Sequence, residues 1–157
     1  MATARPAAAP DSPILARMLH DFNTEFGDPS PGVEVLSGRV AKFIAADVKA
    51  YLLGAEQAGG EPVGFAQISF NPTIWSERPI AHLDELYVVP ACRGRGVGRA
   101  LMEAFVALAR EHGAPRAEVV TGEDDSAARA LYERFGFANE VEGPDNSRSL
   151  FYELDLE

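Results

Sequence analysis

The chain has 157 residues, of which 46% are hydrophobic and 24% charged, a composition that predicts one globular domain over residues 1–157. Aspartate and glutamate outnumber lysine and arginine by 24 to 14, and the formal net charge of -10 excludes the broad basic surface that nucleic-acid binding needs. No apolar run reaches the ~20 residues that span a bilayer, the N-terminus lacks the apolar stretch of a secretory signal, and the single cysteine forms no internal disulfide. We therefore expect a cytoplasmic protein without nucleic-acid, membrane or metal partners.

Helices are predicted first along the chain. Residues 11–26 repeat apolar side chains at the spacing of one helical face, namely Ile14, Leu15, Met18, Leu19, Phe22 and Phe26. A second helical pattern runs through Leu36, Val40, Phe43 and Ile44. Strands follow: residues 49–56 and 62–70 are predicted to form a hairpin, 71–80 a loop, and 81–90 a strand that Pro90 ends.

Helices and strands alternate in the second half. From Val97 the apolar spacing predicts a helix that Gly113 ends, followed by a short strand over 116–120. Residues 124–137 predict a helix with an acidic cap, and residues 148–156 alternate apolar side chains as a half-buried strand does. The order β-α-α-β-β-β-α-β-α-β-β predicts an α/β (α+β) fold with a mixed sheet and helices on both faces.

A turn rich in glycine and arginine, RGRGVG at residues 93–98, connects the strand that ends at Pro90 to the following helix. The first N–H groups of a helix have no partners within it, glycines let an anion approach them, and arginines add charge-assisted donors. A purely structural turn favours Asp or Glu in the first helical turn, where this chain has Arg99. The turn therefore predicts a phosphate-binding site.

Two common nucleotide motifs do not fit this turn. A nucleoside-triphosphate loop needs Lys and then Ser or Thr after its last glycine, where Arg99 and Ala100 stand. A dinucleotide fingerprint needs a third glycine or alanine, and the two possible frames place Leu101 or Arg99 there. The turn therefore belongs to another class of phosphate site.

Three segments in order carry a more specific pattern. Arg93, Gly96 and Gly98 fit the spacing Arg/Gln-x-x-Gly-x-Gly/Ala, the segment ELYVVP precedes them, and ARALYERFGF follows. In these segments the chain resembles the GNAT superfamily of acetyl-CoA-dependent N-acetyltransferases. The resemblance implies a GNAT-like mixed, mostly antiparallel central sheet flanked by helices on both faces, with acetyl-CoA as co-substrate and no metal.

The resemblance also implies where acetyl-CoA lies. Its pantetheine arm would lie like an added strand in an opening beside the central strand, hydrogen-bonded to the main chain of Leu86, Tyr87 and Val88. Its pyrophosphate would be held by the turn, at Arg93, Gly94, Arg95, Gly96, Val97, Gly98 and Arg99. Asp125 stands where the family often has an Asn that reaches the cofactor, but Asp125 is also a suitable helix N-cap that could pair with Arg129.

Acetyl transfer to an amine needs a group that takes the amine's proton and a group that protonates the leaving thiolate. The resemblance implies that Tyr132 is the acid, its alternative being a core aromatic. The candidate bases are His82, Asp84 and Glu85, of which we favour Glu85. Strand alternation places His82 and Asp84 on one face of the sheet and Glu85 on the other. By resemblance, a backbone N–H near Val88 is the expected oxyanion donor.

Two further side chains and the acceptor complete the prediction. Cys92 adjoins the turn, and without a histidine beside it in sequence it is predicted to be an unreactive thiol rather than an acyl carrier. Trp75 either lines the acceptor site or has a packing role.

The acidity of the chain favours a small cationic primary amine as acceptor. The alternatives are a non-catalytic CoA- or acyl-CoA-binding sensor and a protein or peptide N-acetyltransferase, and the final strand could pair in a homodimer.

Overall fold

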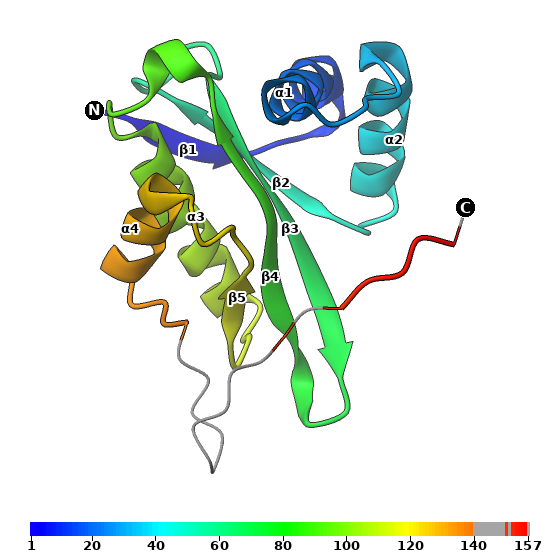
Figure 1. The fold of residues 1–157 in the computed structure, drawn as a ribbon, viewed down its shortest axis with the longest axis vertical. Helices are drawn as coiled ribbons and strands as arrows, with labels where there is room; N and C mark the ends of the chain where they lie inside the picture. The colour runs from blue at the N-terminus through cyan, green and yellow to red at the C-terminus, as the bar shows by residue number, and fades with distance from the viewer. Residues whose placement is uncertain (140–149, 151, 157) are drawn as a thin grey trace. The chain divides into compact units, whose positions relative to one another are not determined.

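The computed structural model describes residues 1–139, 150 and 152–156 (Figure 1). Within it the chain divides into two compact units, Met1–Val120 and Thr121–Glu157, which are described separately. The single domain over residues 1–157 stays a prediction. Within the described residues, no helix is long and apolar enough to cross a membrane.

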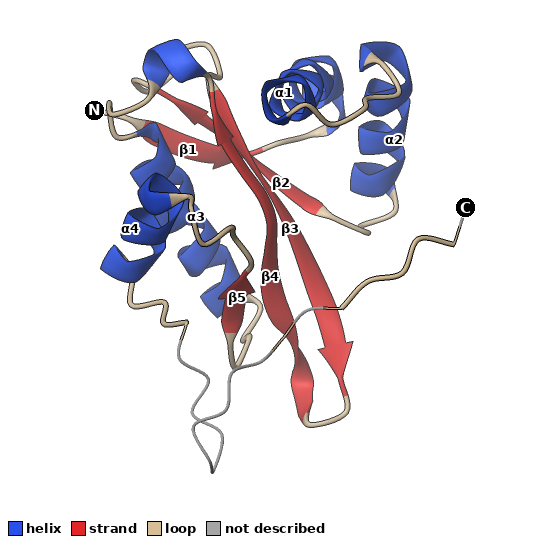
Figure 2. Ribbon diagram, in the orientation of Figure 1, coloured by secondary structure: helices blue, strands red, loops and turns tan. Residues whose placement is uncertain are grey.

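The first unit combines one sheet with three helices, in the order that the sequence predicts (Figures 1 and 2). Two short 3-10 helices, Ala9–Asp11 and Pro90–Cys92, precede α1 and the glycine–arginine turn. The regular elements are β1 (Thr3–Pro6), α1 (Ser12–Phe26), α2 (Val33–Ala45), β2 (Ala50–Ala55), β3 (Gly64–Thr73), β4 (Ser76–Val88), α3 (Val97–Glu111) and β5 (Ala117–Val119).

The strands form a single mixed sheet in the order β1-β2-β3-β4-β5. The first four strands pair antiparallel with their neighbours, and β4 pairs parallel with β5. Helices α1 and α2 cover one face and α3 covers the other (Figure 2). The predicted mixed, mostly antiparallel sheet with helices on both faces is therefore confirmed.

The face under α1 and α2 holds an apolar cluster. Phe65 of β3 lies opposite Tyr87 of β4 in the strand register, and their ring centroids are 6.0 Å apart. The buried members of the cluster come from two helices and three strands: Leu15, Met18, Val40, Tyr51, Leu53, Phe65 and Tyr87. This cluster fixes which side of β4 faces α1.

The other face receives the start of α3 at very close range. A Cβ atom at Gly54 of β2 would lie 2.8 Å from Val97 Cγ1 and 3.0 Å from Leu101 Cγ. Val97 and Leu101 are both buried there, so the first turn of α3 is held against the middle of the sheet. The packing places the glycine–arginine turn beside the end of β4.

The segment over residues 71–80, predicted as a loop, is instead the outer part of the β3–β4 hairpin. Strand β3 continues to Thr73 and β4 begins at Ser76. Much of this part of the hairpin is exposed, so its sequence lacks the apolar alternation of a half-buried strand. Trp75 lies in the tight turn with its side chain 92% exposed, so the packing role considered for it is wrong.

The second unit contains α4 (Ser126–Arg134), which falls within the predicted helix. Gly136 follows it with φ 86°, the left-handed conformation of a helix stop. Residues 150 and 152–156 are neither helix nor strand, so the predicted strand over 148–156 is wrong at these positions. The remaining positions of that segment lie outside the described residues. An alternating pattern forms a strand only where a neighbouring strand pairs with its backbone, and the described part of this unit contains none.

Candidate active site

Strand β4 has one edge that β5 covers only in part. Residues Ala81–Leu83 pair with Ala117–Val119, and β4 then continues to Val88 without a further β5 partner among the described residues. On its other side β4 stays paired with β3 as far as Val88. The main chain of Leu86, Tyr87 and Val88 therefore borders a strand edge that an extended ligand could pair with. The pairing with the pantetheine arm that the resemblance implies stays a prediction.

The glycine–arginine turn follows directly after this edge. Gly94 and Gly96 have φ values of 75° and 89°, in the left-handed region that favours glycine, and Gly96 is the N-cap of α3. A Cβ atom at Gly94 would meet nothing within 4 Å, so the glycine there serves the backbone angle and not a close contact. The turn aims the first N–H groups of α3 away from the helix, as an anion site requires.

The structure pairs each arginine of the turn with a carboxylate, which the sequence analysis did not predict. Arg93 donates from its two terminal nitrogens to Glu25 of α1 at 2.8 and 2.7 Å. Its Nε donates to the Val88 carbonyl oxygen at 2.9 Å, and its guanidinium lies 5.7 Å from the centre of the Tyr87 ring. The hydrogen bond from Arg93 lowers the pKa of Glu25.

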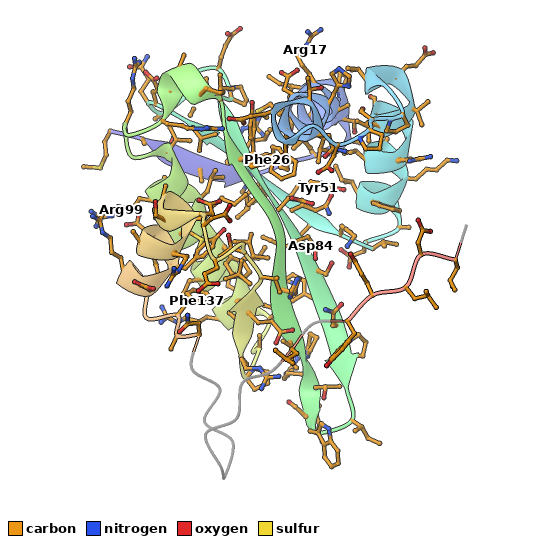
Figure 3. All side chains as sticks on the ribbon, viewed as in Figure 1. Arg17, Phe26, Tyr51, Asp84, Arg99 and Phe137 are labelled. Carbon is orange, nitrogen blue, oxygen red and sulfur yellow. The ribbon has the colours of Figure 1, made fainter. Side chains whose placement is uncertain are left out.

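The other two arginines make similar exposed pairs. Arg95 donates to Glu56 at 2.8 Å, and Arg99 donates to Glu103 at 2.9 Å, one turn further along α3. Figure 3 shows Arg99 extending outward from α3. The positive charge of the turn is therefore balanced by internal carboxylates, at sites that water and a ligand can reach.

Before the glycine–arginine turn, strand β4 contains a bulge that changes which residues share a face of the sheet. Gln67 pairs with Glu85, whereas the next residue, Ile68, pairs with Leu83, so Asp84 is an extra residue on β4. Because of this extra residue, His82 and Glu85 both lie on the face that carries Tyr87. The prediction that Glu85 faces away from His82 is therefore wrong, since simple alternation assumes no bulge.

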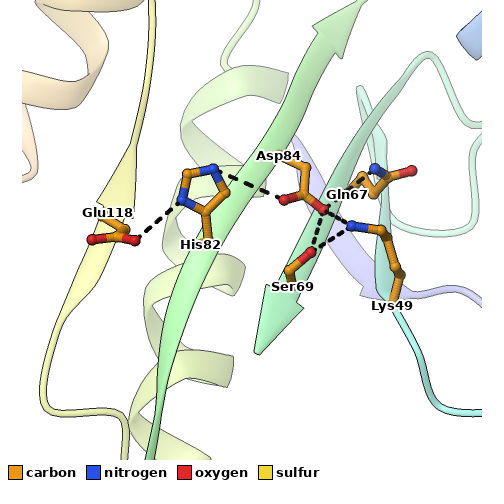
Figure 4. Close-up of polar contacts among 6 residues, drawn as sticks. All are labelled: Lys49, Gln67, Ser69, His82, Asp84 and Glu118. Carbon is orange, nitrogen blue, oxygen red and sulfur yellow. Dashed lines mark hydrogen bonds and ion pairs between the residues drawn. The ribbon is translucent and has the colours of Figure 1, made fainter. Parts of the chain in front are cut away.

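Asp84 lies at the centre of a polar cluster (Figure 4). Its Oδ2 accepts hydrogen bonds from Lys49 Nζ at 2.7 Å, from Ser69 Oγ at 2.6 Å and from Gln67 Nε2 at 3.3 Å. Lys49 also donates to Ser69 at 2.6 Å. No local sequence pattern predicts these three partners. The one available signal was Ser69, a hydroxyl in an otherwise apolar strand, which is 8% exposed.

His82 stands between two carboxylates (Figure 4). Its Nε2 is 3.9 Å from Asp84 Oδ1, and its Nδ1 is 3.5 Å from Glu118 Oε1 of β5. Nδ1 is buried and makes no hydrogen bond in the part of the chain that the structure describes. His82 thus lies one residue before Leu83, the last residue of β4 that pairs with β5, close to one end of the open edge.

Glu85 and Tyr51 have shifted acidities. Burial raises the pKa of Glu85, and the negative charges of Asp84 and Asp28 raise it further, while the positive charge of Lys49 lowers it. Burial and the charge of Asp84 raise the pKa of Tyr51 to about 12. Tyr51 is therefore a neutral phenol at physiological pH, in the same cross-strand row as Gln67 and Glu85.

The two remaining predicted residues, Tyr132 and Asp125, belong to the second unit, and their roles toward the cofactor stay predictions. Asp125 caps α4, because its side chain accepts a hydrogen bond from the Ala128 N–H at 3.0 Å. The predicted pair with Arg129 is wrong, since that guanidinium donates to the Glu123 carbonyl oxygen at 2.9 Å. Tyr132 lies on α4 with its ring centroid 6.2 Å from that of Phe137.

Cys92, at the end of the 3-10 helix before the turn, is a free thiol. A hydrogen bond to Glu56 raises the pKa of the thiol, which lowers its thiolate fraction. A less ionised thiol is a poorer nucleophile, in keeping with the unreactive role expected for it.

Residues 15–137 match the model of the acetyltransferase (GNAT) family. The chain is 31% identical over 105 residues to D-amino-acid N-acetyltransferase HPA3 of Saccharomyces cerevisiae, covering 66% of this chain and 65% of that protein. It is 33% identical over 129 residues to streptothricin acetyltransferase of Streptomyces lavendulae, covering 82% of this chain and 60% of that protein. The chain thus spans less than two thirds of the length of these two relatives.

A solved structure gives a similarity over almost the whole chain. A protein of Arthrobacter sp. FB24 that has been assigned as an acetyltransferase superposes with a TM-score of 0.85 at 39% identity. The alignment covers 98% of this chain and 96% of that protein.

Proposed function

Because this chain belongs to the GNAT acetyltransferase family, we propose that it transfers the acetyl group of acetyl-CoA directly to a primary amine. The observation that carries the proposal is the open edge of β4, which leads straight into the glycine–arginine turn. An extended thioester arm paired with Leu86–Val88 would bring the pyrophosphate to the N-terminus of α3. Members of the family use acetyl-CoA in this way, as a co-substrate.

The chemistry divides between two kinds of group. A base on β4, chosen from His82, Asp84 and Glu85, takes a proton from the acceptor's ammonium, and the neutral amine attacks the thioester carbonyl carbon. The carbonyl oxygen becomes an oxyanion, for which an N–H near Val88 is the proposed donor. The carbon–sulfur bond then breaks, Tyr132 protonates the departing thiolate, and the second proton of the new amide nitrogen restores the Tyr132 phenol. Asp125 contacts the cofactor in this scheme in addition to capping α4.

We infer a small cationic amine as the acceptor. Burial raises the pKa of Tyr87 and of Glu85, and nearby carboxylates add to it: Glu25 and Asp21 of α1 act on Tyr87, against the opposing charge of Arg93. Asp84 and then Asp28, in the segment after α1, act on Glu85, against the opposing charge of Lys49. A positively charged ligand is attracted to such a field. The named activities of the relatives, on streptothricin and on D-amino acids, also concern small amines.

The test is acetyl-CoA mixed with a panel of amines while free thiol is followed. The panel contains streptothricin, an aminoglycoside, spermidine, D- and L-amino acids and a peptide with a free N-terminus. Amine-dependent thiol release with a small cationic member is the expected result. Tight CoA binding without release for any amine would favour a non-catalytic CoA sensor, and release with the peptide alone would favour a protein or peptide acetyltransferase.

A further inference from the structure

The two neighbouring carboxylates on the bulge of β4 differ in their hydrogen bonding. Asp84 Oδ2 accepts from Lys49, Ser69 and Gln67, and a carboxylate oxygen has two lone pairs to offer. The three donors therefore saturate this oxygen, and the Asp84 side chain is only 16% exposed. Asp84 has little capacity left to accept a proton from a ligand through that atom.

Glu85 is in the opposite situation. No residue in the described part of the chain donates a hydrogen bond to its carboxylate, and the side chain is half-buried. The bulge at Asp84 turns Glu85 to the face shared with His82 and Tyr87, next to the open edge of β4. Its oxygens are therefore available to an acceptor that approaches the thioester from this face.

We propose that Lys49 is a positioning residue that holds the Asp84 side chain in its hydrogen-bonded cluster, so that Glu85 is the carboxylate that takes the acceptor's proton. The inference rests on the proposed acetyl transfer and assigns its base. In the step, an N–H proton of the acceptor's ammonium moves to a Glu85 oxygen, and the freed lone pair forms the new carbon–nitrogen bond. The carbon–sulfur bond breaks with its electron pair on sulfur, the nitrogen of the new amide gives up its second proton, which ends on that sulfur, and Glu85 returns its proton to water.

The charges around Glu85 determine the sign of each perturbation. Asp84 on β4 and Asp28 after α1 disfavour its negative charge, while Lys49, before β2, favours it. Tyr51 on β2 is a neutral phenol, and His82 and Tyr87 are further titratable groups on this face of β4. Removing Lys49 therefore moves the titration of Glu85 to higher pH, and removing the charge of Asp84 moves it to lower pH.

The first test needs no substrate. The glutamate carboxyl carbons of the full chain are isotope-labelled, the Glu85 signal is assigned with Glu85→Gln, and its titration is followed by NMR. Lys49→Met is expected to raise the midpoint, Asp84→Asn to lower it, and Lys49→Arg to leave it near the wild-type value. An unmoved midpoint in both Lys49→Met and Asp84→Asn would overturn the proposal.

A double variant protects this test against misfolding. Lys49→Met leaves a poorly exposed carboxylate without its cation, which can destabilise the chain. Lys49→Met with Asp84→Asn removes both charges, and its midpoint should lie between those of the two single variants. A double variant that titrates outside that interval would contradict the charge argument.

The second test uses acetyl-CoA and the amine that gives the fastest thiol release with the wild-type protein. Glu85→Gln should lower kcat by about 10²- to 10⁴-fold, the contribution of a general base, while Asp84→Asn should lower it by less than about tenfold. The acid limb of kcat/KM should move in the same direction as the NMR midpoint. A loss in Asp84→Asn as large as that in Glu85→Gln would refute the assignment.

The failures of the two proposals are distinguishable. A wild-type protein that releases no thiol with any amine contradicts the proposed function, and with it the role of Glu85 as base. The NMR titration would still decide whether Lys49 sets the charge state of this pair.

Discussion

Arg93 and Glu25 form a contact whose two sides should respond oppositely to mutation. In the structure Glu25 occupies the guanidinium that the proposed function gives to the CoA pyrophosphate. If the pyrophosphate displaces Glu25, then Arg93→Ala removes a ligand group and Glu25→Gln removes a competitor. Arg93→Ala should therefore weaken CoA binding, and Glu25→Gln should strengthen it.

The size of each effect follows from the geometry. The two side chains are 46% and 31% exposed, and an exposed ion pair contributes about 0.2–1 kcal/mol, so Glu25→Gln should tighten CoA binding by at most about fivefold. A charge-assisted hydrogen bond contributes about 1.5–3 kcal/mol, so Arg93→Ala should weaken binding by about 10- to 150-fold. The opposite signs are more diagnostic than either magnitude.

The assay is calorimetric titration of CoA into each variant at fixed salt. Arg5→Ala is the matched control, because Arg5 makes the same two-pronged contact with Asp11 elsewhere in the first unit, at 2.9 and 2.8 Å. The control should bind CoA as the wild type does. If Arg93→Ala and Glu25→Gln both weaken CoA binding, the pair serves to hold α1 in place, and the reasoning is refuted.

Three predictions concern stability. Gly54→Ala should lower the free energy of unfolding, measured in urea, by about 1–3 kcal/mol, because the new Cβ would lie 2.8 Å from Val97 Cγ1. Gly38→Ala in α2, where a Cβ would meet nothing within 4 Å, should raise the free energy of unfolding by about 0.5–1 kcal/mol. Equal effects of the two substitutions would contradict the packing argument. Asp125→Ala should lower the free energy of unfolding by about 1 kcal/mol, because α4 loses its N-cap, whereas Asp125→Asn should keep most of the stability that the cap provides. If Asp125→Asn destabilises the chain as much as Asp125→Ala does, the cap is not responsible. Arg5 lowers the pKa of Asp11 to about 2, so the pair stabilises the fold above the ordinary aspartate pKa of 3.8, and this contribution is lost as pH falls toward 2. Arg5→Ala should accordingly reduce the free energy of unfolding by at most about 1 kcal/mol at pH 7 and by less as pH falls through 2, and a deficit at pH 2 as large as that at pH 7 would contradict this explanation.

Local patterns in the sequence predicted the elements whose signals are local. The apolar stripe of α1 and the glycines around α3 were sufficient for their helices, because helical periodicity and left-handed turns are properties of short segments. The outer part of the β3–β4 hairpin was missed because its exposed residues carry no alternation.

The candidate site depended on long-range pairing that no local pattern marks. Lys49 and Asp84 are 35 residues apart, and Glu25 precedes Arg93 by 68. The bulge at Asp84 was equally invisible, because Asp84 and Glu85 are both acidic and a shift of one residue leaves the pattern unchanged. Local patterns thus predict the strand and the turn, whereas the partners that distinguish their side chains come from distant parts of the chain.

The most direct test of the account measures both products of one reaction. Wild-type protein is mixed with acetyl-CoA and the best amine of the panel, and free CoA, N-acetylated amine and intact protein mass are quantified by mass spectrometry. Direct transfer predicts equal amounts of CoA and N-acetylated amine, with no acetylated protein accumulating. CoA release that does not depend on the amine, or an acetyl group that stays on the protein, would contradict it.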